Sequence, residues 1–202
     1  MKKLISYDSE VILTFIFACV GVWIVGHFVP SVVQRFFVVR GSMSWSNPMD
    51  YVRLVSYVFG HANIQHLYGN MILILFIGPA LEEKYGSVRL FFMILATAII
   101  TGIINVTFFS SGLLGASGIV FMLIILGSIV RKSEGTIPLT FILAVVFFMG
   151  KEVYAMFEAD NVSQMAHLIG GACGAMFGFG ISKTRKSETE KEPEKIDDFS
   201  DI

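Results

Sequence analysis

The chain has 202 residues, of which 54% are hydrophobic and 15% charged, with a net charge of −1 and a mean hydropathy of +0.71. Soluble proteins average about 25% charged residues, so this composition excludes an ordinary soluble domain and indicates a polytopic membrane protein. Without a basic excess, we expect no nucleic-acid partner.

Six apolar segments, long enough or nearly long enough to cross a bilayer, follow one another along the chain. They lie at residues 11–29, 61–81, 88–109, 115–130, 137–156 and 163–182. The first resembles the start of a signal peptide, but the acidic residues Asp8 and Glu10 precede it and no A-x-A cleavage signal follows it. The sequence therefore predicts an all-α membrane protein with a retained first helix and a six-helix domain over residues 11–182.

The distribution of basic residues predicts the orientation of these helices. If the N-terminus, residues 1–10, is cytoplasmic, eleven of the fifteen Lys and Arg residues fall on the cytoplasmic side. Both termini are then cytoplasmic, and the long loop at about 30–57 is external. That loop mixes aromatic and charged residues, which is typical of a segment at the membrane interface. The tail at 183–202 has five cations, seven acids and few apolar residues, and we expect it to be disordered.

Four polar side chains lie inside apolar segments, where such groups are costly and usually face the interior of the bundle. They are His66 and Asn70 in the second segment, Ser117 in the fourth and His167 in the sixth. Ser117 lies 14 residues, and each histidine 16 residues, before a charged residue at the cytoplasmic end of its segment. At about 1.5 Å per residue, all three lie roughly 6–9 Å below the external surface of a ~30 Å core.

Small residues surround Ser117 and follow His167 at four-residue intervals. They are Gly115 and Gly118 in the fourth segment and Gly170 and Gly174 in the sixth. Two such surfaces can pack closely, which predicts that the imidazole of His167 approaches the hydroxyl of Ser117.

These residue types indicate nucleophilic catalysis. A serine hydroxyl needs an adjacent base, and histidine has a suitable pKa for that role. His66 and Asn70, with the backbone N–H of Ser117, are candidate donors to an oxyanion. The acids Glu152 and Glu158 lie at a helix end, so a Ser–His dyad is favoured over a triad.

Other interpretations remain for each motif alone. A Gly-x-Ser-Gly sequence is more often a packing motif, and a histidine in a membrane helix more often lines a pore or packs. A channel or transporter is disfavoured because the ionisable groups all lie in the outer third of the predicted membrane. Cys19 and Cys173 form no metal-binding spacing, and we expect no metal.

Taken together, the motifs resemble those of the rhomboid family of intramembrane serine proteases. The matching residues are His61, His66 and Asn70, the Gly115–Gly118 segment, Ala166-His167 with Gly170 and Gly174, and Glu82 with Gly86. The resemblance implies a six-transmembrane-helix rhomboid-like bundle. It also implies that Ser117 is the nucleophile, His167 the general base and His66 and Asn70 the oxyanion donors, with His61 organising the site.

The resemblance further implies an activity and a location. The chain would cleave transmembrane-protein substrates in or near their membrane span, through an acyl-enzyme and without a cofactor. Substrate would enter near residues 137–162, and the site would open to the external side of the cell membrane. A catalytically silent relative that binds membrane helices is the alternative. The oligomeric state is left open.

Two positions depart from the family's pattern. The family often has Trp-Arg where this chain has Val52-Arg53, and Trp45 or Tyr51 is a candidate for replacing the missing aromatic ring. Many members carry Tyr where this chain has Phe121. We expect the Phe121 ring still to stack on the catalytic histidine.

Overall fold

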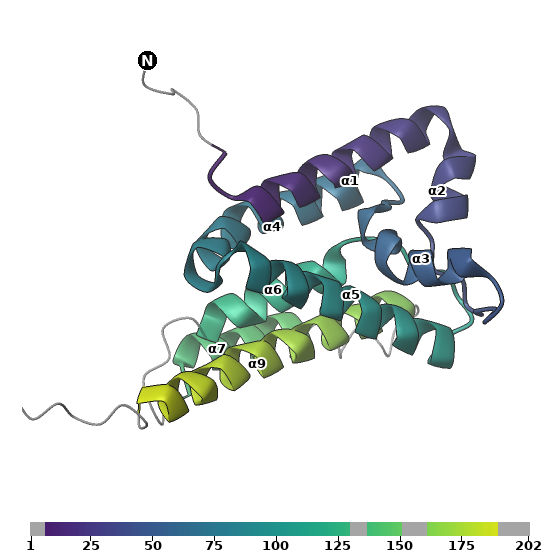
Figure 1. Cartoon of the computed structure of the whole chain (residues 1–202). Helices are drawn as coiled ribbons and strands as arrows, with labels where there is room; N and C mark the ends of the chain where they lie inside the picture. The colour runs from purple at the N-terminus through teal and green to yellow at the C-terminus, as the bar shows by residue number, and fades with distance from the viewer. Residues whose placement is uncertain (1–6, 130–136, 151–160, 190–202) are drawn as a thin grey trace, which may run out of the picture.

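Residues 7–129, 137–150 and 161–189 are described by the computed structural model, and they are mainly helical (Figure 1). The elements are α1 (Glu10–Phe28), α2 (Pro30–Phe36), α3 (Pro48–Ser56), the 3₁₀ turn η1 (Tyr57–Phe59), α4 (Ile64–Tyr85), α5 (Ser87–Phe108), α6 (Ser117–Ile129), α7 (Leu139–Ala144), the π-helical η2 (Val145–Met149) and α9 (Asn161–Thr189). Within the described ranges, the predicted all-α class is confirmed.

Three of the described helices, α1, α4 and α5, are long and apolar enough to cross a membrane. The apolar helices α6 and α7–η2 are shorter; at 1.5 Å per residue, the 13 residues of α6 extend about 20 Å. The six predicted segments correspond to α1, α4, α5, α6, α7–η2 and α9. Residues 151–156, at the predicted end of the fifth segment, lie outside the described part of the chain.

The last helix differs from its predicted end. α9 continues to Thr189, so residues 183–189 are helical where the sequence predicted the start of a disordered tail. Lys, Arg and Glu are good helix formers, and here they prolong a helix that is already nucleated by its packed apolar part. Residues 190–202 lie outside the described ranges.

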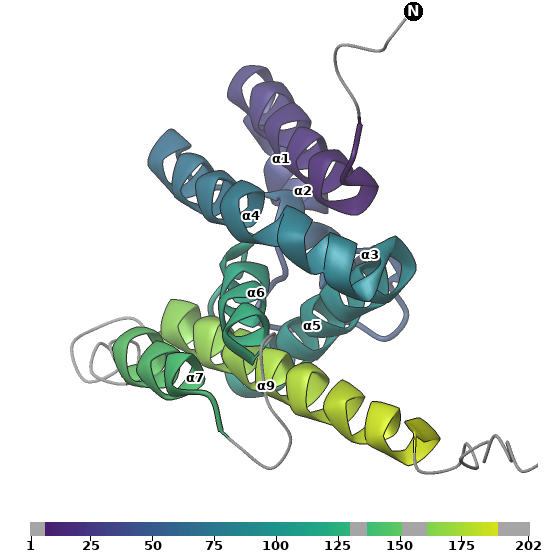
Figure 2. The ribbon, with the colours of Figure 1, turned by 90° about the vertical axis from the view of Figure 1, so that its left-hand side faces the viewer.

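The central element of the bundle is α6, which lies between α4 and α9 in Figure 2. It is apolar on all sides, and nine of its 13 residues are buried. A helix of this kind is stable only when neighbours cover its whole circumference. Helices α4, α5, α7 and α9 supply that cover, so the N-terminus of α6, where Ser117 lies, is fixed by several neighbours at once.

A buried carboxylate joins α1 to the end of α4. Glu82 accepts hydrogen bonds from the backbone N–H groups of Val11 and Ile12, at 2.9 and 3.0 Å, and from the hydroxyl of Ser87, at 2.7 Å. First-turn N–H groups have no partner within their own helix, and a negative charge at this end is favourable. Glu82 therefore caps α1 from another helix and fixes its position.

The predicted loop at 30–57 contains two helices that the sequence interpretation missed. Pro30 and Pro48 each occupy a first helical position, and the side chain of Asn47 accepts a hydrogen bond from the N–H of Met49 at 3.1 Å. Proline at this position and asparagine as an N-cap are both strong start signals. Phe37 follows α2, and Trp45 is 80% exposed.

Candidate active site

The loop before α6 requires glycine at residue 115. Its φ of +121° is strained for any L-residue with a side chain, and a Cβ there would lie 2.5 Å from Cε1 of His66. The N–H of Gly115 donates to the carbonyl oxygen of Tyr57 at 3.0 Å, and Leu113 pairs with Val39 through two backbone hydrogen bonds of 2.9 Å. These contacts fix the approach to Ser117, and they place the loop against the first turn of α4.

Helices α6 and α9 meet with their backbones almost in contact. A Cβ on Gly170 would lie 2.0 Å from the carbonyl oxygen of Gly118, and a Cβ on Gly118 would lie 3.2 Å from that of Ala166. Ser117 immediately precedes Gly118, and His167 immediately follows Ala166. Ser117 and His167 are therefore each next in sequence to a residue that takes part in this contact.

The close contact continues along the same pair of helices. A Cβ on Gly174 would lie 2.4 Å from the carbonyl oxygen of Met122. Gly170 and Gly174 thus form the surface on which α6 rests, and neither position has room for a larger side chain.

The ring of His167 is stacked on the ring of Phe121, as predicted. Their centroids are 4.3 Å apart and the planes differ by 5°. Phe121 also meets Phe148 of η2 edge-on, at 6.2 Å and 87°. The first contact limits rotation of the imidazole, because a stacked aromatic pair loses its favourable overlap when one ring turns.

The histidines and the asparagine of the second segment form a second group. The rings of His61 and His66 meet edge-to-face at 5.0 Å. Asn63 begins α4 as its N-cap, accepting from the N–H of His66 at 2.8 Å. Since Gly115 touches His66, this group and the Ser117 loop are in direct contact.

A hydrogen-bond chain orders His61 and Asn70, both of which are buried. Nδ2 of Asn70 lies 3.1 Å from Nε2 of His61, and Nδ1 of His61 lies 3.3 Å from the carbonyl oxygen of Phe59. Because an amide nitrogen only donates, Nε2 accepts and the proton of a neutral ring sits on Nδ1, from which it reaches Phe59. One N–H of Asn70 is thus used to hold His61, and among the described residues no acceptor binds the second.

Several contributors to this site were missed by the sequence interpretation. Tyr57 accepts from Gly115 and donates its hydroxyl to the carbonyl oxygen of Ala98 at 3.1 Å. Asn105 is buried and donates to the carbonyl oxygen of Ser111 at 3.2 Å, which anchors the Ser117 loop to α5. A polar residue inside an apolar run was the available signal for Asn105. Nothing in the local pattern around Tyr57 indicated a bridge.

The departure at Val52-Arg53 leaves the arginine firmly held. Arg53 is buried, its Nε donates to the carbonyl oxygen of Arg35 at 2.8 Å, and its guanidinium pairs with Asp50. The hydroxyl of Tyr51 donates to the backbone oxygen of Trp45 at 3.0 Å. Arg53 therefore links α3 to α2 whether or not an aromatic residue precedes it.

Among the described residues, no cluster of three or more His, Cys, Asp or Glu is placed to hold a metal ion. Cys19 and Cys173 are buried and unpaired with each other. The candidate acids Glu152 and Glu158 lie outside the described ranges. The arrangement supports acyl transfer by a hydroxyl and an imidazole, with donors supplied from the start of α4.

Comparison with known proteins gives a consistent assignment. Residues 48–184 match the family of the rhomboid domain. The chain is 30% identical over 157 residues to Rhomboid-related protein 2 of Mus musculus, covering 70% of this chain and 51% of that protein. It is 31% identical over 142 residues to Rhomboid-related protein 1 of Caenorhabditis elegans (64% and 39%), and 29% over 150 residues to RHOMBOID-like protein 4 of Arabidopsis thaliana (70% and 35%). The matched regions span about a third to a half of the length of these relatives.

Proposed function

The chain belongs to the rhomboid family, and we propose that it is an intramembrane serine endopeptidase that cleaves transmembrane proteins in or near their membrane span. The observation that carries the proposal is the contact of Gly118 with Gly170 and Ala166, because it brings Ser117 and His167 to one level from two separate helices. Packing alone needs small residues at this crossing, but it does not need a hydroxyl and an imidazole beside them.

In the proposed reaction, Oγ of Ser117 attacks the carbonyl carbon of the scissile peptide bond and His167 accepts the hydroxyl proton. The C–N bond then breaks, and His167 returns the proton to the departing amine. Water deacylates the resulting ester by the reverse proton transfers. The stack of Phe121 on His167 keeps the imidazole in one orientation through these steps.

The developing oxyanion needs donors close to the start of α6. The N–H of Ser117, the ring of His66 and the second N–H of Asn70 are the proposed donors. Contact of Gly115 with His66 supports this assignment, as does the hydrogen bond that fixes Asn70 on His61. These contacts hold the His66 and Asn70 side chains of α4 in place before a substrate binds.

We further propose that six helices cross the membrane with both termini in the cytoplasm, so that the site opens to the external side. The basic residues of the sequence support this orientation. Membership of the rhomboid family supports the further proposal that substrate enters beside α7–η2.

Proteolysis in liposomes tests the proposal. We expect wild type to cleave a model single-pass substrate and to react with a fluorophosphonate, and Ser117→Ala and His167→Ala to lose at least about 10³-fold in activity. Ser110→Ala, which removes an exposed serine from the same loop, is the matched control and keeps wild-type rates. A folded wild type that neither labels nor cleaves but binds the substrate helix would instead establish the catalytically silent alternative.

A further inference from the structure

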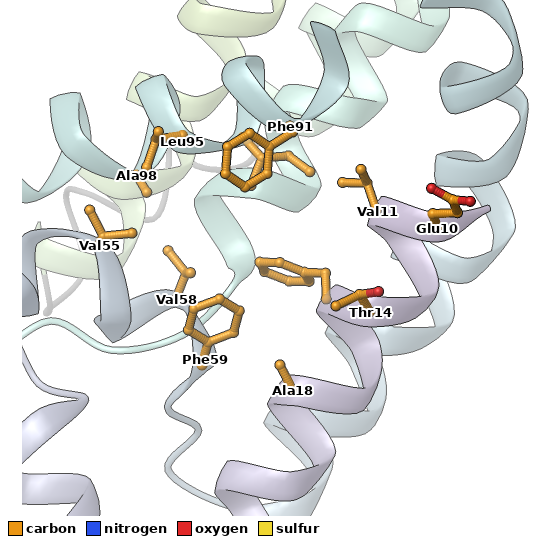
Figure 3. Close-up of a pocket in the computed structure, with 12 residues that line it drawn as sticks. Glu10, Val11, Thr14, Ala18, Val55, Val58, Phe59, Phe91, Leu95 and Ala98 are labelled. Atoms are coloured by element: carbon orange, nitrogen blue, oxygen red, sulfur yellow. The ribbon is translucent and has the colours of Figure 1, made fainter. Parts of the chain in front are cut away.

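An apolar cavity of about 390 Å³ lies away from the candidate active site, between α1 and α5 (Figure 3). Side chains from three elements converge on it: Val11, Thr14, Phe15 and Ala18 of α1, Val55, Val58 and Phe59 of the α3–η1 segment, and Phe91, Ile94, Leu95 and Ala98 of α5. Glu10 lies at one end. The volume falls within the range of ligand sites, which are mostly apolar with a few polar groups.

The α3–η1 segment creates this cavity by holding α1 and α5 apart. On the α5 side, the hydroxyl of Tyr57 donates to the carbonyl oxygen of Ala98. On the α1 side, the rings of Phe15 and Phe59 pack at 5.1 Å, and Sγ of Cys19 lies 3.8 Å from the carbonyl oxygen of Val58. These contacts join η1 to both walls of the cavity.

The polar end of the cavity lies at the start of a candidate membrane span. Glu10 is the first residue of α1, and the capping of α1 by Glu82 places this end beside the start of α5. From Glu10 to Ala18 the cavity wall extends about 12 Å, at 1.5 Å per residue, which is less than half of a ~30 Å core. An occupant with a polar head at Glu10 and a hydrocarbon tail towards Ala18 would match the site in polarity and depth.

We propose that this cavity holds one acyl chain of a bilayer lipid whose headgroup carries an ammonium group. Helices α1 and α5 are both candidate membrane spans by length and composition, which supports an occupant drawn from the bilayer. An empty apolar space costs stability in proportion to its volume, and an acyl chain fills it without introducing an unsatisfied polar group.

Charge decides between headgroups. The carboxylate of Glu10 is exposed, and none of the described residues forms an ion pair with it. It attracts an ammonium and repels a headgroup whose only charge is the phosphate. The hydroxyl of Thr14, 3.0 Å from that of Tyr7, adds a neutral hydrogen-bonding partner at the same end.

Photocrosslinking in bilayers tests the site without depending on proteolysis. Full-length protein is reconstituted with phosphatidylethanolamine, or with phosphatidylglycerol, carrying the same diazirine in one acyl chain, and labelled peptides are mapped. We expect the phosphatidylethanolamine probe to label the α1 and α5 lining. Ala18→Phe, which fills the cavity, should lower labelling of the lining about tenfold, and Glu10→Gln should lower the preference for phosphatidylethanolamine about threefold.

Val25→Phe is the matched control, because it adds the same ring to an exposed position of α1 outside the cavity. Leu95→Trp fills the space from α5. It replaces Ala18→Phe if the Ala18→Phe variant unfolds at a lower temperature than wild type. Labelling spread over the whole lipid-facing surface and insensitive to both filling variants overturns the site. Equal labelling by the two probes overturns the headgroup assignment.

Discussion

The side of the bundle formed by α6 and α9 and the side formed by α1, η1 and α5 are packed in opposite ways. On the first, glycines bring two backbones into contact, and a Cβ on Gly170 would lie 2.0 Å from Gly118. On the second, side chains separate the helices and leave a cavity of about 390 Å³. Close packing is thus concentrated where groups from different helices must meet, and catalysis is sensitive to displacements of about 1 Å.

The two sides are also stabilised by different interactions. The cavity side depends on hydrogen bonds from one element to the backbone of another, through Glu82 and Tyr57. The α6–α9 side depends on the absence of side chains. Substitutions on the cavity side should therefore change stability, and those on the α6–α9 side should change both stability and activity.

Among substitutions that keep both Ser117 and His167, the largest effect is expected for Gly170→Ala. The added methyl collides with the backbone of Gly118, so α6 and α9 must separate. Overpacking of this kind costs about 1–3 kcal/mol of stability, and the shift of His167 should lower proteolysis about 10²-fold. Thermal unfolding in detergent and cleavage in liposomes measure the two effects.

Gly180→Ala is the matched control for Gly170→Ala, because it makes the same change on the same helix where a Cβ meets nothing within 4 Å. Helix propensity alone should stabilise that variant by up to about 1 kcal/mol. If the two variants behaved alike, the backbone contact would not be what positions the site.

Glu82→Gln should separate stability from activity. The neutral amide is a weaker acceptor and brings N–H groups where the first turn of α1 already presents its own donors, so we expect a loss of about 1–3 kcal/mol. Cleavage per folded molecule should stay within about twofold, since the residue lies at the far end of α4 from His66. Glu83→Gln, at the neighbouring exposed position, should change neither. A selective fall in turnover would show that the two sides are coupled.

Phe121→Ala should lower turnover with a smaller effect. Loss of the stack on His167 removes about 1 kcal/mol of orienting interaction, equivalent to about a fivefold fall in kcat. Phe121→Tyr keeps the ring and should keep the wild-type rate. Unchanged turnover in Phe121→Ala would exclude the ring as a positioning residue.

The sequence predicted the elements whose signals are local. The apolar segments located α1, α4 and α5 within a few residues, and glycine spacing identified the face of α9 that meets α6. Similar distances from charged residues, 14 and 16 positions, predicted that Ser117 and His167 lie at one depth, and the Gly118–Gly170 contact supports this. These features follow from periodicity and length, which a single chain displays.

The sequence did not predict features that depend on partners far apart in the chain. Capping of α1 by Glu82 joins residues 70 and 71 positions apart, and no helix-start pattern around Glu10 reveals it. The helix α3 has a start signal in Asn47-Pro48, but the mixture of aromatic and charged residues around it is equally typical of an interfacial loop. The cavity beside it results from three elements meeting, and no local pattern encodes such an encounter.

The smallest effect is expected on the cavity side, at Asp50 of α3. A hydrogen bond from the backbone N–H of Ser44, and then the guanidinium of Arg53, hold the pKa of Asp50 below its usual value of 3.8, against the opposing effect of burial. The folded state therefore favours the carboxylate. Its contribution to stability is complete above the unfolded pKa and is lost as the pH falls below about 3.8 towards the folded value.

Asp50→Asn should accordingly cost about 1 kcal/mol at pH 7, and the difference from wild type should shrink below about pH 4. Unfolding midpoints measured from pH 7 to 3 test this, with the exposed Asp8→Asn as the control. Because α3 leads into η1, which separates α1 from α5, loosening it should weaken the cavity walls while the glycine contact of α6 with α9 stays intact. A parallel loss of proteolysis would mean that the cavity side influences the geometry of the α6–α9 side through the hydrogen bond between Gly115 and Tyr57.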